Sequence, residues 1–164
     1  MNPILVIRSV TGWTQSRLAE TAGTSQPTIA AYEGGSKSPT WRTITGIAQA
    51  AGLTCHPFVG VPFTRDQARS LVLHQAIAEQ LSADPEQVLS VALTNIALMV
   101  ELHPDAAALL DEWDQVLQLP VARIVSTMLD PSEHGRDLRQ VTPFAGVLTA
   151  EKRTQVYRRF RAAA

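Results

Sequence analysis

Gln26 and Thr28 are polar residues in a segment whose apolar residues have helical spacing. Ile29 and Tyr32 are three apart. In a helix these two share one face, which leaves Gln26, Thr28 and Ala31 on the outer face. A glutamine side chain can pair bidentately with adenine, and a threonine methyl group can touch the methyl group of thymine. The outer face of this segment therefore has the chemistry needed to read base edges in a major groove.

The residues before this segment contain the signals for a helix, a turn and the start of a second helix. Residues 14–22 have the spacing of a short helix, and Gly23 follows where a helix end often needs a positive φ. Thr24 or Ser25 can cap the next helix, and Pro27 fits its first turn. The pattern predicts two short helices joined by a tight turn, either a DNA-binding hairpin or an ordinary hairpin of a helical bundle.

Further helices are expected on both sides of this hairpin. Asn2 followed by Pro3 is a helix-start signal, and apolar residues continue this helix to about residue 11. After a polar loop over residues 34–39, another helix is expected over about residues 40–51. Four or five helices in the first third of the chain would form a compact domain of the size expected for DNA binding.

Residues 2 to about 53 resemble the Xre/Cro/C1-type helix-turn-helix family of phage-repressor-like regulators. The matching residues are Gln15, Leu18, Ala19, Gly23, Ser25, Gln26, Ile29, Tyr32, Glu33, Gly35 and Pro39. The resemblance covers about a third of the chain, and its motifs are specific. It implies a four- to five-helix domain that binds double-stranded operator DNA with its third helix in the major groove.

The resemblance also assigns DNA contacts to individual residues. It implies that the glutamine opening the second helix contacts a phosphate, that the third helix reads bases, and that the following loop and the next helix start hold the backbone. The expected DNA-binding residues are Gln15, Ser25, Gln26, Pro27, Thr28, Ala31, Ser36, Lys37, Ser38 and Arg42. Pro27 and Ala31 lack hydrogen-bonding side chains, so apolar contacts and DNA shape would carry part of the specificity.

Arg8 and Glu33 form a predicted structural ion pair. In the family that the chain resembles, an arginine late in the first helix often pairs with the glutamate that ends the third helix, and these positions hold Arg8 and Glu33 here. A partly buried pair would fix the recognition helix, and removal of one partner can cost ~3–5 kcal/mol. The alternative is two solvated surface charges.

Composition and charge narrow the class of protein. Hydrophobic residues make up 45% of the 164 residues, the single cysteine excludes an internal disulfide, and the net charge is −1. No apolar run is long enough to span a membrane, so a cytoplasmic protein is expected.

Residues 1–59 carry a net charge of +2, residues 60–150 of −7 and residues 151–164 of +4. A DNA-binding part this weakly basic predicts a homodimer or an added partner, because phosphate contacts dominate DNA affinity.

The rest of the chain is predicted to be helical. Residues 54–64 contain two prolines and one glycine, which predicts an extended connector that could include a short strand. Helices are then expected over residues 64–81, 84–102, 103–118, 120–129 and 149–161, with a short one near 131–138. The prediction is an all-α protein with a DNA-binding domain over 1–53, a connector over 54–64, and a helical domain over 65–164 for oligomerisation or partner binding.

A polar run beside an aromatic turn, over residues 136–146, is a candidate docking surface with Arg136, Arg139 and Phe144 as partner-binding residues. This segment is loosely similar to the tails of actinobacterial Xre-type regulators, some of which lie beside a nucleotidyltransferase-like toxin. The similarity implies a surface that binds a cognate toxin. The alternative is a tail that wraps its own bundle.

The basic terminal helix is either a solvated end or a surface near DNA or an acidic partner.

The sequence contains no pattern typical of catalysis or of a cofactor. The four histidines are scattered, and none has the spacing of a metal-ligand motif. No metal, no cofactor and no enzymatic activity are expected. The leading hypothesis is a sequence-specific transcriptional regulator that represses its own promoter as a homodimer. The alternative is an antitoxin whose helical region binds a neighbouring toxin, and the two can coexist.

Overall fold

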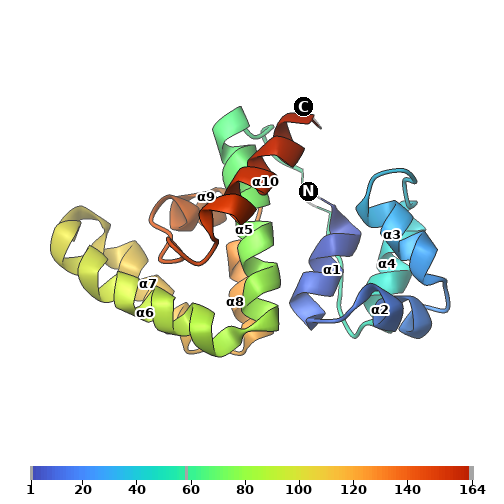
Figure 1. Ribbon diagram of the computed structural model, residues 1–164, viewed down its shortest axis with the longest axis horizontal. Coiled ribbons are helices and arrows are strands. Elements are labelled where there is room, and N and C mark those ends of the chain that lie inside the picture. The colour runs from blue at the N-terminus through green and yellow to red at the C-terminus, as the bar shows by residue number, and fades with distance from the viewer. Residues whose placement is uncertain (1, 58, 163–164) are drawn as a thin grey trace. The chain divides into compact units, whose positions relative to one another are not determined.

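The structure, a computed structural model, describes residues 2–57 and 59–162 and is all-helical over these residues (Figure 1). The chain divides into two compact units, Met1–Val59 and Gly60–Ala164. No strand is assigned to residues 54–57 or 59–64, so the short strand considered for the connector is not found there. A strand needs a paired neighbour, and the described part of this connector has none. Phe58 and residues 163–164 of the expected ranges lie outside the described residues.

Four helices form the first unit. They are α1 (Pro3–Thr11), α2 (Gln15–Thr21), α3 (Gln26–Glu33) and α4 (Trp41–Ala50). Each begins after a polar cap whose side-chain oxygen accepts a hydrogen bond from a backbone N–H of the first turn; the caps are Asn2, Thr14, Ser25 and Thr40. Since the sequence places such a residue before each helix, local hydrogen bonding sets where the four helices start.

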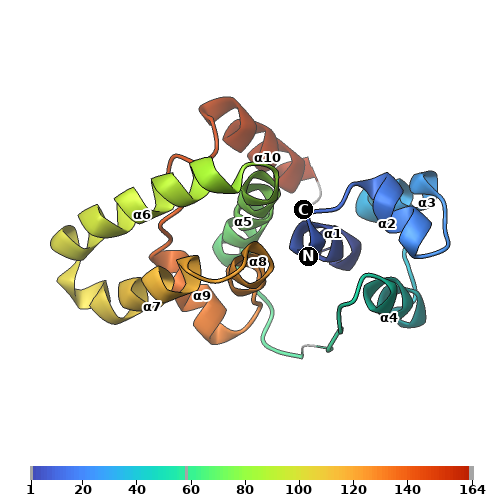
Figure 2. The same cartoon turned by 90° about the horizontal axis from the view of Figure 1, so that it is seen from below.

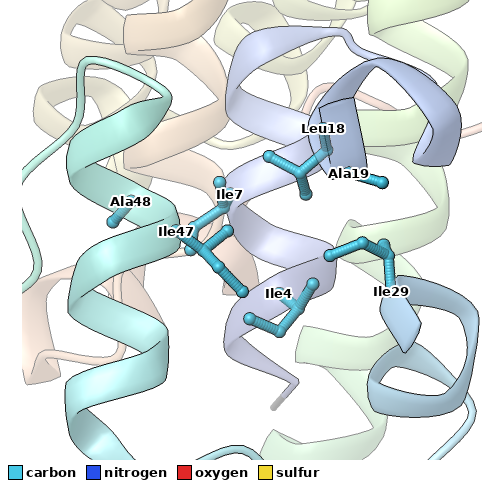
Figure 3. Close-up of a cluster of buried hydrophobic side chains, with 7 residues drawn as sticks. All are labelled: Ile4, Ile7, Leu18, Ala19, Ile29, Ile47 and Ala48. Carbon is cyan, nitrogen blue, oxygen red and sulfur yellow. The ribbon is translucent and has the colours of Figure 1, made fainter. Parts of the chain in front are cut away.

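The core of the first unit joins all four helices (Figure 3). Its buried residues are Ile4, Ile7, Leu18, Ala19, Ile29, Ile47 and Ala48. Ala19 is buried where α2 and α3 approach each other, and its small side chain suits a close crossing. Burial of each large aliphatic side chain stabilises the fold by about 1.5–3 kcal/mol. This core holds α3 by its inner face and leaves its outer face uncovered within the unit.

The second unit contains six further α-helices in its described part. They are α5 (Arg65–Ala83), α6 (Pro85–Leu102), α7 (Ala107–Leu117), α8 (Val121–Met128), α9 (Glu133–Gln140) and α10 (Ala150–Ala162), with a short 3₁₀ turn over Pro104–Ala106. The expected helix over 103–118 therefore begins later, because its proline starts the 3₁₀ turn instead. Helices α6 and α7 contact each other where the 3₁₀ turn joins them and diverge from this end in Figure 2, while α10 packs on α5 (Figures 1 and 2).

Trp113 and Phe144 are the largest fully buried side chains of the second unit. Their rings meet edge to face with centroids 5.3 Å apart, a favoured aromatic geometry. The Trp113 indole Nε1 donates a hydrogen bond of 2.9 Å to the carbonyl of Leu138. These contacts join α7 to α9 and to the irregular segment before α10, so the tail folds onto its own bundle.

Candidate nucleic-acid interface

A tight turn joins α2 to α3. Gly23 has a φ of +63°, and a Cβ built there would meet no atom within 4 Å. Glycine is therefore favoured at this position by its backbone conformation rather than by a lack of space. The N–H of Thr24 donates to the carbonyl of Ala19 at 2.9 Å, which closes the end of α2. Ser25 then caps α3, its Oγ accepting from the N–H of Thr28 at 3.4 Å.

The outer face of α3 carries the side chains expected to read DNA. Ile29 is fully buried, while Gln26 and Pro27 are exposed and Thr28 and Ala31 are half-buried. The four residues proposed for base contact thus share the uncovered side of the helix. The hydroxyl groups of Ser25 and Thr28 are 2.9 Å apart and share one hydrogen bond in which either can be the donor, so the hydroxyl group that accepts keeps its own hydrogen for another acceptor.

Four polar side chains form a continuous chain of bonds across α1, α2 and α3. Arg8 Nε donates to Glu33 Oε1 at 2.7 Å. Gln15 Nε2 donates to Glu33 Oε2 at 2.8 Å. Gln26 Nε2 donates to Gln15 Oε1 at 2.7 Å. The ion pair expected between Arg8 and Glu33 is thus present, and the Glu33 carboxylate also holds Gln15, which in turn holds Gln26. We call these four residues the polar chain.

The polar chain leaves DNA-binding groups available on both glutamines. A glutamine amide offers two N–H donors and one carbonyl acceptor. Gln15 uses one N–H and its carbonyl internally, so its second N–H remains for a phosphate oxygen. Gln26 uses only one N–H in the hydrogen bonds of the polar chain, which leaves one donor and its carbonyl acceptor. That remaining pair is the combination that adenine requires in the major groove.

The C-terminal end of α3 is anchored separately. Asn2 Nδ2 donates to the carbonyls of Tyr32 at 2.6 Å and Glu33 at 3.1 Å, while Asn2 Oδ1 caps α1. One asparagine therefore fixes the start of α1 against the end of α3. Together with the polar chain, this contact sets the orientation of the recognition helix within its unit.

The residues expected to contact the DNA backbone lie in the loop after α3 and at the start of α4. Ser36 Oγ donates to the carbonyl of Ala31 at 3.2 Å, so this hydroxyl group also has a structural role at the helix end. Lys37 and Ser38 are exposed, as is Arg42 in the first turn of α4. An exposed ammonium and an exposed guanidinium can each neutralise a phosphate.

Trp41 is a candidate contact that the sequence reasoning did not single out. It is the first residue of α4, directly before Arg42, and remains 50% exposed. The indole N–H can donate to a phosphate oxygen. Trp41 is three residues before Ile44 and falls in the apolar spacing of its helix, so the sequence favours a buried residue at this position.

The structure corrects the hypothesis that Arg139 and Phe144 form a docking surface. Both are buried. The Arg139 guanidinium donates from one nitrogen to the carbonyls of Met128 at 3.1 Å and Asp130 at 2.6 Å, which satisfies carbonyls left at the end of α8. Burial lowers the pKa of Arg139. Arg136 is half-buried, with its guanidinium 5.9 Å from the centre of the Phe63 ring. The segment wraps its own bundle.

The comparisons with known proteins identify the class of the first unit. A family model described as a helix-turn-helix domain matches residues 6–56. This range contains α2, α3 and α4 and most of α1. The search of curated proteins and the search of solved structures returned no match. The protein is therefore all-helical with an N-terminal helix-turn-helix domain, the fold of a DNA-binding regulator.

The described residues contain neither a candidate metal site nor a candidate membrane-spanning helix. Over residues 2–57 and 59–162, no group of histidine, cysteine, aspartate and glutamate residues could hold a metal ion. Within the same ranges, no helix is both long enough and apolar enough to cross a membrane.

Proposed function

We propose that this protein is a sequence-specific transcriptional regulator of the Xre/Cro/C1 type, acts without enzymatic activity in the cytoplasm, and binds operator DNA by inserting α3 into the major groove. The observation that carries the proposal is the polar chain. It presents Gln26 with one free donor and its free carbonyl on the outer face of α3. A helix held in this way can read bases with little loss of side-chain freedom on binding.

The proposed DNA contacts follow from where each residue lies. Gln26 and Thr28 read base edges, and Pro27 and Ala31 make apolar contacts with them. Phosphates are held by the second N–H of Gln15, by the loop after α3 and by the first turn of α4. The residues with backbone contacts are Gln15, Ser25, Ser36, Lys37, Ser38 and Arg42. Trp41 is a further residue that we propose to contact a phosphate, through its indole N–H.

We propose that the protein acts as a homodimer that represses its own promoter. The first unit carries a net charge of only +2 over residues 1–59, so one protomer makes few phosphate contacts. A two-fold dimer would place two copies of α3 at successive half-sites ~34–36 Å apart. Steric occlusion of the promoter then accounts for repression without any catalytic step.

The surface that we assign to the second protomer is the side of α6 that carries Leu98 and Leu102, which are one turn apart and remain 56% and 71% exposed. Leu93 and Val100, 42% and 43% exposed, lie on the other side of this helix. Residues 87–100 carry no charge, and Glu101 would keep its carboxylate in solvent at the edge of such a contact. Such a contact is isologous, as a two-fold dimer requires. In this proposal residues 54–64 connect the DNA-binding domain to a helical domain over 65–164 that dimerises.

A footprint on the DNA upstream of the protein's own gene tests the proposed function. The expected result is protection of two half-sites by the wild-type protein at moderate salt, and loss of this protection with Lys37→Ala combined with Arg42→Ala. The combined variant Arg158→Ala and Arg159→Ala removes two charges from α10 and serves as the control. Absence of any protected region with the folded wild-type protein would contradict the proposal.

The dimer surface has its own test. Leu98→Glu places a charge on the assigned face, and Leu119→Glu places the same charge on an exposed leucine after α7. Sedimentation equilibrium should show a dimer for the wild type and Leu119→Glu and a monomer for Leu98→Glu. A wild-type monomer, or a dimer that persists in Leu98→Glu, would show that another surface joins the protomers or that none does.

The exposed face of α6 also favours a second candidate function, an antitoxin. A toxin encoded by a neighbouring gene, with a nucleotidyltransferase-like activity as one candidate, would then cover this face in place of a second protomer. Co-expression tests this: the neighbouring gene alone should arrest growth, and the wild-type protein but not Leu98→Glu should restore it and co-purify. Normal growth with the neighbouring gene expressed alone would count against this function.

A further inference from the structure

The arginines of α10 do not belong to the helix-turn-helix unit, and one of them, Arg161, lines a cleft together with residues of α5. This cleft of about 340 Å³ lies between the first turns of α5 and the last turns of α10. It is lined by Arg65, Asp66, Arg69, Tyr157, Phe160 and Arg161. A cleft of this size falls at the lower end of the range for small-molecule sites. All of its lining residues come from one compact unit.

The charged groups of the cleft contact one another and the Tyr157 ring at its exposed rim. Asp66 Oδ1 is 3.2 Å from a terminal nitrogen of Arg69, and the Arg69 guanidinium lies 5.8 Å from the centre of the Tyr157 ring. Arg161 Nε donates to the carbonyl of Tyr157 at 3.4 Å. Each contact uses only part of a guanidinium, which has five N–H donors. Arg69 and Arg161 therefore still have donors for a ligand on both sides of the tyrosine.

The lining carries three guanidinium groups and one carboxylate, a net charge of +2. A phosphate monoester carries about −1.5 to −2 at pH 7, so its charge matches that of the cleft. Guanidinium groups bind phosphate oxygens bidentately. Tyr157 and Phe160 add two aromatic rings on the same helix side, and such rings stack on nucleobases by about 1–3 kcal/mol per base.

We propose that the cleft between α5 and α10 binds a free nucleoside monophosphate. Arg65, Arg69 and Arg161 would hold the phosphate, and Tyr157 with Phe160 would contact the base. Duplex DNA is the less suitable ligand, because its bases are stacked internally and its backbone offers nothing for the two aromatic rings to contact. The proposal does not depend on DNA binding by the first unit, and ligand binding is measured in the absence of DNA.

Isothermal titration calorimetry of the full chain tests this proposal, with AMP, adenosine and inorganic phosphate as separate probes. AMP should bind more tightly than either fragment. Arg69→Gln and Tyr157→Leu should each raise the Kd for AMP about tenfold or more, as expected for loss of a charged hydrogen bond or a stacked ring. Arg159→Gln removes the same charge from α10 outside the cleft and should leave the Kd within about twofold of the wild-type value.

The proposal would be overturned if AMP did not bind measurably, or if it bound no more tightly than phosphate or adenosine. It would also be overturned if Arg159→Gln lost as much AMP affinity as Arg69→Gln, which would indicate a diffuse basic surface. Tighter binding of an oligothymidine without terminal phosphates than of AMP would assign the cleft to single-stranded nucleic acid instead. If Arg69→Gln or Tyr157→Leu fails to fold, Arg161→Gln replaces it, because its side chain is exposed and bonds only to a backbone carbonyl.

Discussion

Replacement of Glu33 by glutamine is expected to destabilise the first unit and to weaken DNA binding together. The Glu33 carboxylate accepts from Arg8 with one oxygen and from Gln15 with the other. A glutamine side chain has only one acceptor oxygen, so its NH₂ group must face one of these two donors. The substitution therefore sets a donor against a donor at a site where the Glu33 side chain is 9% exposed and that of Arg8 is 21% exposed.

The size of the effect follows from this burial. Removing one partner of a fully buried pair costs ~3–5 kcal/mol, and the partial exposure of Arg8 reduces the expected cost to about 2 kcal/mol. For a domain of this size, roughly 4–8 °C of Tm is lost per kcal/mol, so the Tm of the first unit should fall by about 10 °C. Loosening Gln15 and Gln26 adds an ordering cost of about 0.5–1.5 kcal/mol per side chain, which predicts about a tenfold weaker operator affinity.

Thermal unfolding and operator titration measure both effects. Tryptophan fluorescence reports on the first unit through Trp13 and Trp41 and on the second unit through Trp113, so only the transition of the first unit should shift in the variant. Fluorescence anisotropy of a labelled operator gives the affinity. Glu20→Gln is the matched control, because it removes the same charge from an exposed position on α2. If Glu33→Gln matches Glu20→Gln in both Tm and affinity, the polar chain has no role in holding α3.

Three further predictions concern other parts of the molecule. Phe144→Ala should destabilise the second unit by about 3–5 kcal/mol in urea unfolding, because it leaves a cavity beside Trp113. Arg136→Ala, the control, should lower the free energy of unfolding by less than about 1 kcal/mol. Equal losses in the two variants would contradict the buried position of Phe144. Burial lowers the pKa of His74 to about 4, so the unfolded chain binds this proton before the folded chain does. As the pH falls from 6.5 to 4, the wild type should therefore lose roughly 3 kcal/mol more of its free energy of unfolding than His74→Gln. Parallel pH profiles of the free energy of unfolding in the two proteins would refute this. Lys37→Ala should weaken binding to all DNA sequences alike and lower the salt slope by about 1, and a loss restricted to one sequence would contradict a phosphate contact.

Local capping signals are the part of the fold that the sequence predicts well. The sequence pattern Thr64 to Gln67 predicts a capping box, and the two residues form it at the start of α5. Asp84 caps α6 directly before Pro85. These signals depend on hydrogen bonds within one turn, so neighbouring residues are enough to specify them. The same holds for Ser25 at the start of α3.

Contacts between distant segments are the part that the sequence does not predict. The arginine-rich run over 136–140 has the composition of a surface, yet Arg139 is buried because its guanidinium meets carbonyls at the end of α8. In α6 the helical spacing of apolar residues also predicts Leu89 and Met99 on the inward face, yet both are only half-buried. The covered arc of this helix is set by its neighbours α5 and α7, and helical spacing cannot specify how wide that arc is.

The residues that we propose to contact DNA were predicted only in part from the sequence. Helical spacing placed Gln26 and Thr28 on the outer face of α3, which the structure leaves uncovered within its unit. The bond from Gln26 to Gln15 joins two helices, and spacing within either helix carries no information about it. Trp41 was missed because its type suggests a core residue, whereas half of its surface is exposed at the start of α4.

Selection of bound sequences from a random DNA library tests the central claim most directly, with the wild type, Gln26→Ala and Lys37→Ala compared side by side. The wild type should enrich a site with two related half-sites. Gln26→Ala should change the preferred base at one position in each half-site, while Lys37→Ala should keep the wild-type preference at lower affinity. If the wild type enriches no sequence, or if Gln26→Ala prefers the same base at every position, α3 does not read DNA through Gln26.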